Sequence, residues 1–211
     1  MPPPLIAVFA KAPRPGLVKT RLGLDPALAV ALHEAFVRDT LMLAQAASPR
    51  VELHTDVETE AWRDLTGVPR RQQVSGDLGA RMYAVLASAT PTAPVLILGS
   101  DSPSLPHAHL AQLISTPGDV VLGPADDGGY WAILARRADA AMFAEVEWST
   151  ARAFDQTLAA ARAAGLSTGA GPTWFDVDEP RSLRKLIGRP LLQRPHTRDF
   201  LTRNPIAVHL P

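Results

Sequence analysis

The sequence contains no cysteine, and this absence excludes several kinds of chemistry. Disulfide bonds, zinc–thiolate sites and thiol nucleophiles all require cysteine, so the fold and any catalysis must rely on other groups. No run of apolar residues reaches the length needed to span a bilayer, and Met1-Pro-Pro-Pro4 lacks the basic and apolar regions of a signal peptide. We therefore expect a cytoplasmic protein that does not associate with membranes.

The chain also lacks an excess of charge of either sign. Lysine and arginine together number 21, as do aspartate and glutamate, and the pI is near 7.0. Domains that bind nucleic acids are usually strongly basic, so this balance argues against a nucleic-acid partner. Of the 211 residues 46% are hydrophobic and 20% are charged, which is typical of a well-filled globular domain rather than of disorder.

Short β-like segments alternate with helical patterns along most of the chain. The expected strands are 5–9, 51–55, 71–74, 95–99, 120–123, 130–135 and 173–177, and the expected helices are 26–47, 58–65, 78–89, 107–115, 150–164 and 181–187. This alternation predicts an α/β fold with a mostly parallel central sheet and helices on both faces. We expect one domain over residues 1–188. A tail rich in proline and arginine, 189–211, either wraps the surface or contacts a partner subunit in a homodimer.

A loop rich in cations follows the first expected strand. It combines four cations with a proline and a glycine: Lys11, Arg14, Pro15, Gly16, Lys19 and Arg21. Backbone N–H groups and fixed positive charge ahead of a helix bind polyphosphates, so we interpret the loop as a phosphate-binding segment. The alternative is an ordinary connecting loop whose cations are solvated. It is not a Walker A loop, because the G-x-x-x-x-G-K-[ST] spacing is absent.

Three aspartates form the second candidate feature. Asp101 follows the buried strand 95–99, at the sheet edge where open α/β folds bind ligands. Asp176 and Asp178 lie two residues apart in an extended segment, which would place both carboxylates on one side. A Mg²⁺ or Mn²⁺ ion shared by the three would relieve their repulsion, because hard cations prefer oxygen ligands. The alternative is that Asp101 and Asp178 cap the helices that follow them.

Further motifs contribute candidate substrate-binding residues. Asp77, beside Gly76 at an expected helix start, would bind a sugar hydroxyl or cap the helix. Arg81 would reach a phosphate or form a surface ion pair. Ser149 and Thr150 are typical of a helix N-terminus.

The segment Asp126-Asp127-Gly128-Gly129-Tyr130 predicts a turn between two strands. Its two glycines would also let the backbone approach a substrate closely, with Tyr130 forming a wall of the site. If the chain transfers a sugar from a nucleotide-sugar, Asp126 or Asp127 could act as the base toward the acceptor.

Taken in order, these motifs resemble those of the DUF2064 family of the glycosyltransferase-A superfamily, whose members are described as transferase 1, rSAM/selenodomain-associated. The matching segments are 9–13 with 15–22, 76–79 with 81–82, 99–103, 123–130, 148–150 and 176–178. Ser102 stands where a cysteine is common in the family, which removes a thiol but leaves the neighbouring carboxylate in place.

The family is similar to the phospholactate guanylyltransferases and, more distantly, to the molybdopterin nucleotidyltransferases. This resemblance implies a single domain of the glycosyltransferase-A type. It also implies that the loop from Lys11 to Arg21 holds a nucleoside triphosphate or a nucleotide-sugar, and that Asp101, Asp176 and Asp178 are metal-binding acids.

We therefore predict a metal-dependent transferase with four catalytic residues, Lys19, Arg21, Asp101 and Asp127. In the first interpretation Lys11, Lys19 and Arg21 neutralise a nucleoside triphosphate. A small phosphorylated or hydroxyl acceptor then attacks the α-phosphorus, and pyrophosphate is released. In the second, a nucleotide-sugar donates its sugar. In the third, the chain binds a nucleotide without catalysis. The other predicted substrate-binding residues are Pro15, Gly16, Gly76, Asp77, Arg81, Gly128, Gly129, Tyr130, Ser149 and Thr150.

Overall fold

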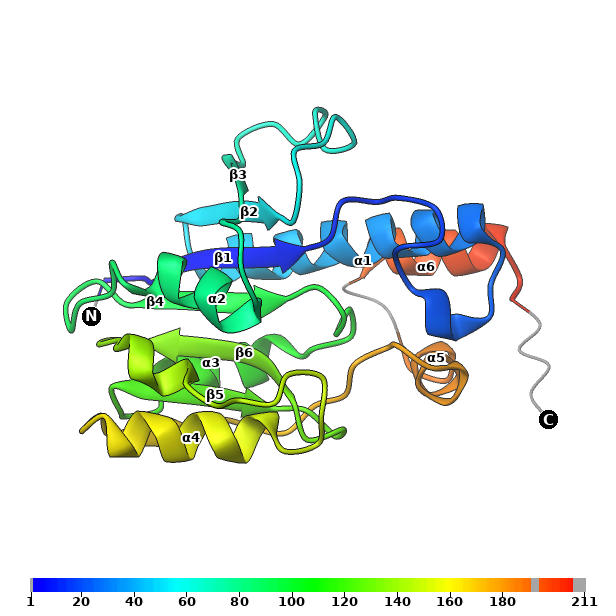
Figure 1. Cartoon of the computed structure of the whole chain (residues 1–211). Coiled ribbons are helices and arrows are strands. Elements are labelled where there is room, and N and C mark those ends of the chain that lie inside the picture. Colours follow the sequence, from blue (N-terminus) through cyan, green and yellow to red (C-terminus); the bar gives the residue numbers. More distant parts are fainter. Residues whose placement is uncertain (1, 191–193, 207–211) are drawn as a thin grey trace.

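A single sheet of seven strands forms the centre of the computed structural model, which describes residues 2–190 and 194–206 (Figure 1). The strands, in chain order, are β1 Leu5–Ala10, β2 Val51–Thr55, β3 Arg70–Gln72, β4 Val95–Gly99, β5 Val120–Pro124, β6 Tyr130–Ala135 and β7 Thr168–Ala170. Their order in the sheet is β3-β2-β1-β4-β6-β5-β7. Only β6 runs antiparallel to its neighbours among the described strands, so the predicted mostly parallel sheet is confirmed.

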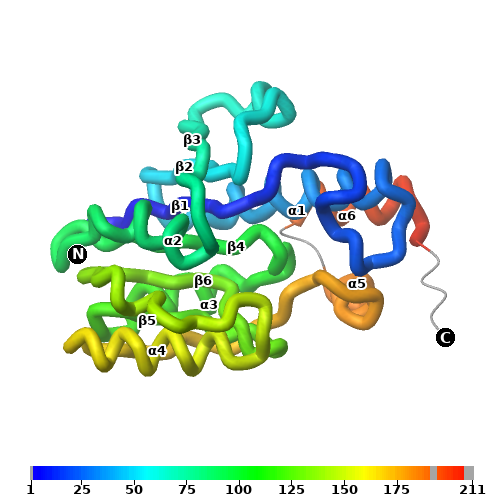
Figure 2. Tube along the Cα trace, in the orientation of Figure 1, coloured from blue at the N-terminus to red at the C-terminus, as the bar shows by residue number. Residues whose placement is uncertain are grey.

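Helices cover both faces of this sheet, as the sequence predicts (Figure 2). The α-helices are α1 Pro26–Ala47, α2 Leu78–Leu86, α3 His107–Ser115, α4 Ala153–Ala163, α5 Pro180–Ile187 and α6 Pro195–Arg203, and two 3-10 turns are η1 Thr20–Leu22 and η2 Ala140–Phe143. Within the described ranges, no helix combines the length and the apolar character that crossing a bilayer requires.

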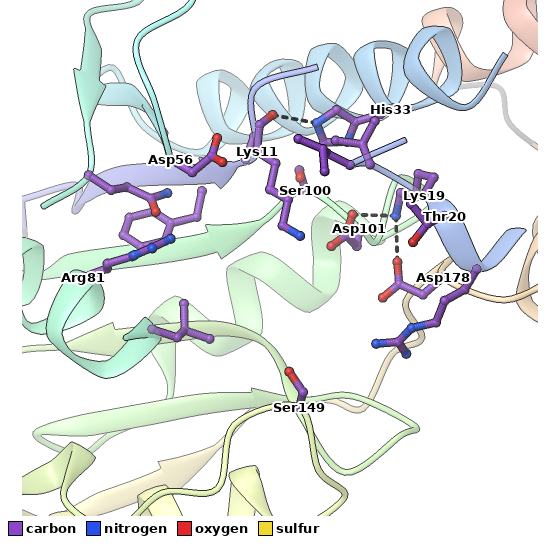
Figure 3. Close-up of a pocket in the computed structure, with 17 residues that line it drawn as sticks. Lys11, Lys19, Thr20, His33, Asp56, Arg81, Ser100, Asp101, Ser149 and Asp178 are labelled. Carbon is purple, nitrogen blue, oxygen red and sulfur yellow. Dashed lines mark hydrogen bonds and ion pairs between the residues drawn. The ribbon is translucent and has the colours of Figure 1, made fainter. Parts of the chain in front are cut away.

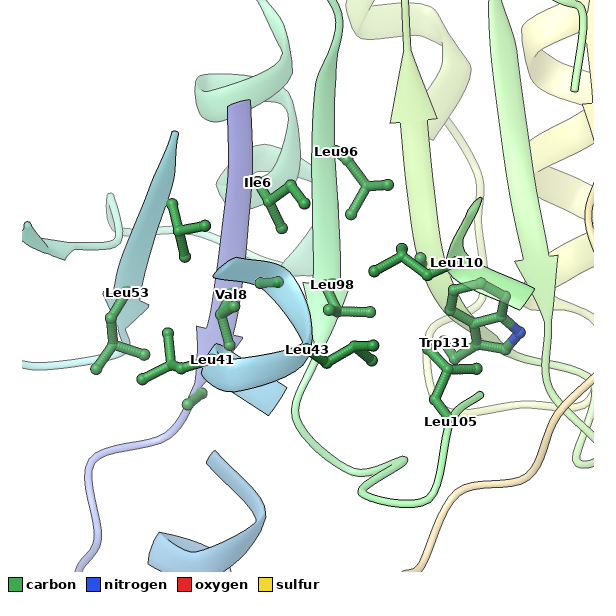
Figure 4. Close-up of a cluster of buried hydrophobic side chains, with 14 of the residues drawn as sticks. Ile6, Val8, Leu41, Leu43, Leu53, Leu96, Leu98, Leu105, Leu110 and Trp131 are labelled. Carbon is green, nitrogen blue, oxygen red and sulfur yellow. The ribbon is translucent and has the colours of Figure 1, made fainter. Parts of the chain in front are cut away.

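Alternate residues of the central strands supply two separate cores. Ile6 and Leu98 point to the face covered by α1 and α3, where they pack with Leu41 and Leu110 (Figure 4). Ile97 points to the opposite face, which α2, α4 and η2 cover. Because both faces of the inner strands are buried, residues of either orientation are apolar. This explains why the sequences of these strands are continuous apolar runs.

Helix α1 begins where the sequence predicts. The side chain of Asp25 accepts hydrogen bonds from the backbone N–H groups of Ala27 and Leu28, and Pro26 occupies the first turn. An aspartate cap followed by proline is a strong start signal, because it satisfies free N–H groups and presets φ. The 22-residue length of α1 then buries its apolar face against β1 and β2.

Two predicted elements are wrong. Residues 58–65 form successive turns rather than a helix, and Trp62 is buried from that irregular segment. The last strand is Thr168–Ala170 rather than 173–177, because residues 168–170, ahead of the predicted segment, are the ones that pair with β5. Trp174 lies beyond that pairing and forms an isolated bridge with Ala125. Short segments without clear periodicity are the hardest to place, since tertiary contacts decide their structure.

The predicted tail contains a helix that packs on the body of the protein. Helix α6 lies beside α1 in Figures 1 and 2, and its Phe200 joins Phe36 and Leu186 in a third apolar cluster. Residues 191–193 and 207–211 of that tail lie outside the described residues. The boundary at residue 188 and the homodimer stay predictions.

We expect Phe200→Ala to lower the free energy of unfolding by about 3–5 kcal/mol, the usual cost of truncating a buried phenylalanine. Phe200 is 8% exposed, whereas Arg203 on the same helix is exposed. Arg203→Ala should therefore change stability by no more than about 0.5 kcal/mol. Urea unfolding of both variants makes the comparison, and equal small losses would show that α6 adds little to the fold.

Candidate functional site

Three parallel strands end at one edge of the sheet, and each is followed within two residues by a charged side chain. Lys11 follows β1, Asp56 follows β2, and Asp101 follows β4 after Ser100. A cleft of about 410 Å³ opens at this edge, where open α/β sheets bind ligands (Figure 3). Further charged and polar residues that line it are Lys19, Thr20, Arg21, His33, Gln73, Arg81, Ser149 and Asp178.

The side chain of Lys19 connects three parts of the chain inside this cleft. Its ammonium group donates hydrogen bonds to Asp101 Oδ1 at 2.5 Å, to the Val177 carbonyl at 2.8 Å and to Asp178 Oδ1 at 3.0 Å (Figure 3). The Lys19 side chain is 2% exposed, whereas those of Asp101 and Asp178 are 44% and 43% exposed. The two carboxylates therefore share one buried cation.

Opposite charges set the ionisation of this group. Burial alone would lower the pKa of Lys19, but the carboxylates of Asp101 and Asp178 outweigh it and raise that pKa above its ordinary value. Burial would likewise raise the pKa of Asp101, and the ammonium of Lys19 reverses the effect and lowers it. Lys19 and Asp101 are thus both charged at neutral pH.

Two residues outside the predicted site hold the cation-rich loop in place. Asp56 accepts hydrogen bonds from the Ala12 backbone N–H and from the Arg14 guanidinium, both at 2.6 Å. His33, which is 3% exposed on α1, lies with Nε2 2.8 Å from the Lys11 carbonyl oxygen. A carbonyl only accepts, so the histidine donates from Nε2. The loop is therefore fixed from β2 on one side and from α1 on the other.

A second cavity of about 320 Å³ adjoins the cleft and shares Arg21 and Asp178 with it. The turn between β5 and β6, the segment 175–179 and α5 form its walls. Asp126 in this turn pairs with Lys185 of α5 at 2.7 Å, while the neighbouring Asp127 accepts the Gly129 N–H at 2.9 Å. Two ligands could accordingly lie side by side, one in each cavity.

Asp176 faces the second cavity and does not join the Lys19 group. Its carboxylate accepts a short hydrogen bond from the Ser102 hydroxyl. Burial raises the pKa of Asp176 to about 7, against the hydrogen bond from Ser102, which favours the ionised form. Within residues 2–190 and 194–206, no group of three or more carboxylates or imidazoles is arranged to hold a metal ion.

Asp101 and Asp178 nevertheless fit a divalent cation. Each contacts Lys19 through Oδ1, and among the described residues neither Oδ2 atom has a hydrogen-bond partner. A Mg²⁺ ion is usually held by one or two carboxylates together with substrate phosphates, and two exposed carboxylates match that donor set. The predicted Mg²⁺ or Mn²⁺ stays a prediction.

The structure gathers seven of the seventeen predicted site residues at the cleft. Lys11, Lys19, Arg21, Arg81, Asp101, Ser149 and Asp178 line it. Asp127 and Asp176 line the second cavity instead. The structure thus shows which of the predicted residues lie close together, and the chemical roles of these residues stay predictions.

Other predicted residues have local structural roles. Asp77 caps α2 by accepting the Ala80 N–H at 2.8 Å. Tyr130 packs in the core against Met82, and burial raises the pKa of its phenol. Eight predicted residues line neither the cleft nor the second cavity: Pro15, Gly16, Gly76, Asp77, Gly128, Gly129, Tyr130 and Thr150.

Helix α4 begins later than the sequence suggests, which changes the interpretation of Ser149 and Thr150. Its N-cap is Arg152, and Ser149 has a φ of 62°, in the left-handed region. Thr150 donates its hydroxyl to the Glu147 carbonyl at 2.7 Å and closes the turn before the helix. Gly128 packs against the backbone of Ala151, where a Cβ atom would meet the Ala151 carbonyl oxygen at 2.2 Å, so glycine is required there.

Sequence reasoning missed Asp56 and His33. Asp56 directly follows the end of a parallel strand, as the expected ligand Asp101 nearly does, and the same positional argument would have identified it. His33 lies among the buried residues Leu32 and Phe36 of α1, where a polar residue needs a buried partner. That partner, the Lys11 carbonyl, is visible only in three dimensions.

Comparison with protein families gives one match, which covers more than half of the chain. A family model described as "Uncharacterized protein conserved in bacteria (DUF2064)" matches residues 30–150. This range includes Asp101 and ends before Asp176. Comparison with the curated proteins gives no match.

Several solved structures similar to this chain are described as nucleotidyl or nucleotide-sugar transferases. A protein from Desulfovibrio desulfuricans G20, provisionally described as a nucleotide-diphospho-sugar transferase, is 27% identical, with a TM-score of 0.80 and coverage of 99% of this chain and 97% of its own. The inositol-1-phosphate CTP transferase from T. maritima is 12% identical, with a TM-score of 0.57 and coverage of 94% and 97%. A nucleotidyl transferase from Methanothermobacter is 16% identical, with a TM-score of 0.52 and coverage of 95% and 99%. The last two show the fold alone.

His33 generates a prediction for the pH dependence of stability. Burial lowers the pKa of His33, so below about pH 6.5 the unfolded chain binds a proton that the folded chain does not. Stability is therefore complete above that pH and is lost as the pH falls through it. In His33→Gln the amide can still donate to the Lys11 carbonyl but cannot titrate. We expect thermal unfolding midpoints from pH 8 to pH 5 to fall less in the variant than in the wild type, and parallel curves would contradict this role of His33.

Proposed function

The chain belongs to the DUF2064 family, and from that premise we propose that it is a nucleotidyltransferase whose cleft binds a nucleoside triphosphate. The observation that carries the proposal is the charge of the cleft. Lys11, Arg21 and Arg81 line it, and none of the three forms an ion pair with the residues that the structure describes. Unpaired cations around one concave site match a polyphosphate, which carries several negative charges on closely spaced oxygens.

The second cavity is the proposed acceptor site. It adjoins the cleft at Arg21 and Asp178, so an acceptor there would lie next to the phosphates of the bound nucleotide. An acceptor oxygen attacks the α-phosphorus, the bond from that phosphorus to the bridging oxygen of the β-phosphate breaks, and pyrophosphate leaves. When the acceptor is a hydroxyl, Asp127 takes its proton. Such transfer depends on positioning and charge neutralisation rather than on a covalent nucleophile.

Asp101 and Asp178 would hold the proposed metal ion together with phosphate oxygens. When bound, Mg²⁺ or Mn²⁺ would supply positive charge at the phosphates that transfer and leave. The protein's own part is to orient these two carboxylates, and Lys19 does so through hydrogen bonds of 2.5 and 3.0 Å. Asp176, the third predicted metal ligand, accepts a hydrogen bond from the Ser102 hydroxyl.

Sugar transfer is the second candidate, because the similar protein from D. desulfuricans is provisionally described as a nucleotide-diphospho-sugar transferase. The same cleft would then hold a nucleotide-sugar, and its cations would stabilise the nucleoside diphosphate that leaves. Asp127 is the better placed of the two turn aspartates to act as the acceptor base, since Asp126 is paired with Lys185. The site geometry is compatible with both donors.

Binding of nucleotides separates these candidates. Calorimetry would compare GTP, CTP, UTP and ATP with UDP- and GDP-sugars, each with and without Mg²⁺ or Mn²⁺. Binding of one triphosphate, with pyrophosphate release when acceptors are added, supports nucleotidyl transfer. Preference for a nucleotide-sugar supports the second candidate. Binding without turnover on any acceptor indicates a module without catalysis, and no binding at all contradicts the assignment of the cleft.

We expect Asp101→Asn to reduce turnover by at least about 10²-fold while the protein stays folded, which is the scale for losing one preorganised electrostatic contact. The substitution keeps the side-chain volume but removes the charge that orients the proposed metal and holds Lys19. Asp155→Asn, on α4 and outside both cavities, is the matched control and should retain activity. Pyrophosphate release measures turnover, and circular dichroism checks the fold. Turnover of Asp101→Asn close to that of the wild type would exclude the proposed role.

A further inference from the structure

The ammonium group of Lys19 has no hydrogen left to donate. Its three donors are matched by three acceptors, Asp101 Oδ1, Asp178 Oδ1 and the Val177 carbonyl, at 2.5 to 3.0 Å. All three are oxygen atoms, and two of them are charged. Carboxylate and carbonyl oxygens are also the ligands that hard divalent cations select.

The side chain of Lys19 is buried and its backbone has an unusual conformation. Its side chain is 2% exposed and its Nζ atom lies 5.1 Å from the ring centroid of Phe36, which is fully buried. Its backbone has a φ of 51°, in the left-handed region, where it precedes the turn η1. If Lys19 turned toward a phosphate, two carboxylates would remain without a counter-charge and a buried carbonyl would lose its donor.

We propose that Lys19 is a built-in counter-cation that occupies the position between Asp101 and Asp178 that a divalent metal ion would otherwise take. The nucleotide-free protein therefore binds no divalent cation between these carboxylates. Under the proposed function, Asp101 and Asp178 would hold a metal ion only together with the bound nucleotide, while Lys19 keeps its place between them. The last statement rests on the proposed function, whereas the first two concern the protein alone.

This role differs from the one that the sequence suggests for Lys19. The loop position predicts a cation that neutralises the triphosphate, but the structure commits Lys19 to the protein's own acids. Neutralisation of the phosphates then falls to Lys11, Arg21 and Arg81, which line the same cleft and form no ion pair among the described residues. Lys19 is thus a positioning residue for Asp101 and Asp178.

Binding of Mn²⁺ to the nucleotide-free protein tests the proposal without any assay of activity. Electron paramagnetic resonance of free Mn²⁺ gives the affinity of each variant. We expect weak binding to the wild type and binding at least about tenfold tighter to Lys19→Met, in which the two carboxylates lack their cation. The double variant Lys19→Met/Asp178→Asn, which removes one carboxylate as well, should return to the wild-type affinity.

Lys11→Met is the matched control, because it removes one positive charge from the same cleft and leaves the Lys19 contacts intact. It should bind Mn²⁺ as the wild type does. An equal gain in Lys11→Met would show that only the net charge of the cleft matters and would overturn the proposal. Unchanged affinity in Lys19→Met, or a wild type that binds as tightly as that variant, would overturn it as well.

Thermal unfolding provides a second readout in case Lys19→Met is unstable. Mn²⁺ should raise its melting temperature and leave those of the wild type and the double variant nearly unchanged. Mn²⁺ that stabilises none of the three would contradict the proposal. Nucleotide binding is measured separately. If the wild-type protein binds none of the nucleotides, the proposed function is refuted, but the Mn²⁺ result can still be interpreted.

Discussion

The hydrogen bonds of one buried ammonium group connect three segments that are far apart in the sequence. Lys19 comes from the loop after β1, Asp101 from the end of β4, and Val177 and Asp178 from the segment before α5. A backbone hydrogen bond of 2.8 Å from the Val177 N–H to the Asp101 carbonyl adds to this connection. The Lys19 side chain is only 2% exposed, so removing either carboxylate would leave a desolvated ammonium group with less counter-charge. The position of each wall of the cleft therefore depends on the others.

The same constraint explains how a loop without a helix-like or strand-like pattern is kept in one conformation. Its start is fixed by His33 and Asp56, and its end by Lys19. Between these points Gly16 has a φ of 74°, which allows the turn at no steric cost. A loop held at both ends presents its cations with little loss of conformational entropy on binding, which is the advantage of preorganisation.

Elements with a long and regular pattern could be predicted from the sequence, and short ones could not. Helix α1 carries a cap, a proline and a repeating apolar face, and the strands β1 and β4 are continuous apolar runs. The predicted bounds of all three agree with the structure to within one residue at either end. Strand β7 has three residues, and pairing with β5 alone determines where it lies. Helix α6 begins in a segment rich in proline and arginine, and its contact with α1 supplies the reason for it to fold.

The candidate site shows the same division. Asp101 could be predicted because the end of a buried strand fixes its position. The different partners of Asp176 and Asp178 could not, because two carboxylates in an extended segment give no sign that one meets Ser102 and the other Lys19. The sequence also does not distinguish a buried lysine from a solvent-exposed one. The partners of Lys19 are distant in sequence, by 82 and 159 positions, and only the fold brings them together.

One antiparallel strand accounts for the second cavity beside the cleft. In a purely parallel sheet every strand end at this edge would be followed by a long crossover connection, and tight turns would lie on neither edge. Because β6 runs against both β4 and β5, the turn at residues 125–129 lies at the same edge as Asp101. Helix α5 then reaches this turn through the ion pair between Lys185 and Asp126. The reversal of a single strand thus places an acidic turn in the cavity that adjoins the cation-rich cleft, which is the arrangement that the proposed transfer between two substrates needs.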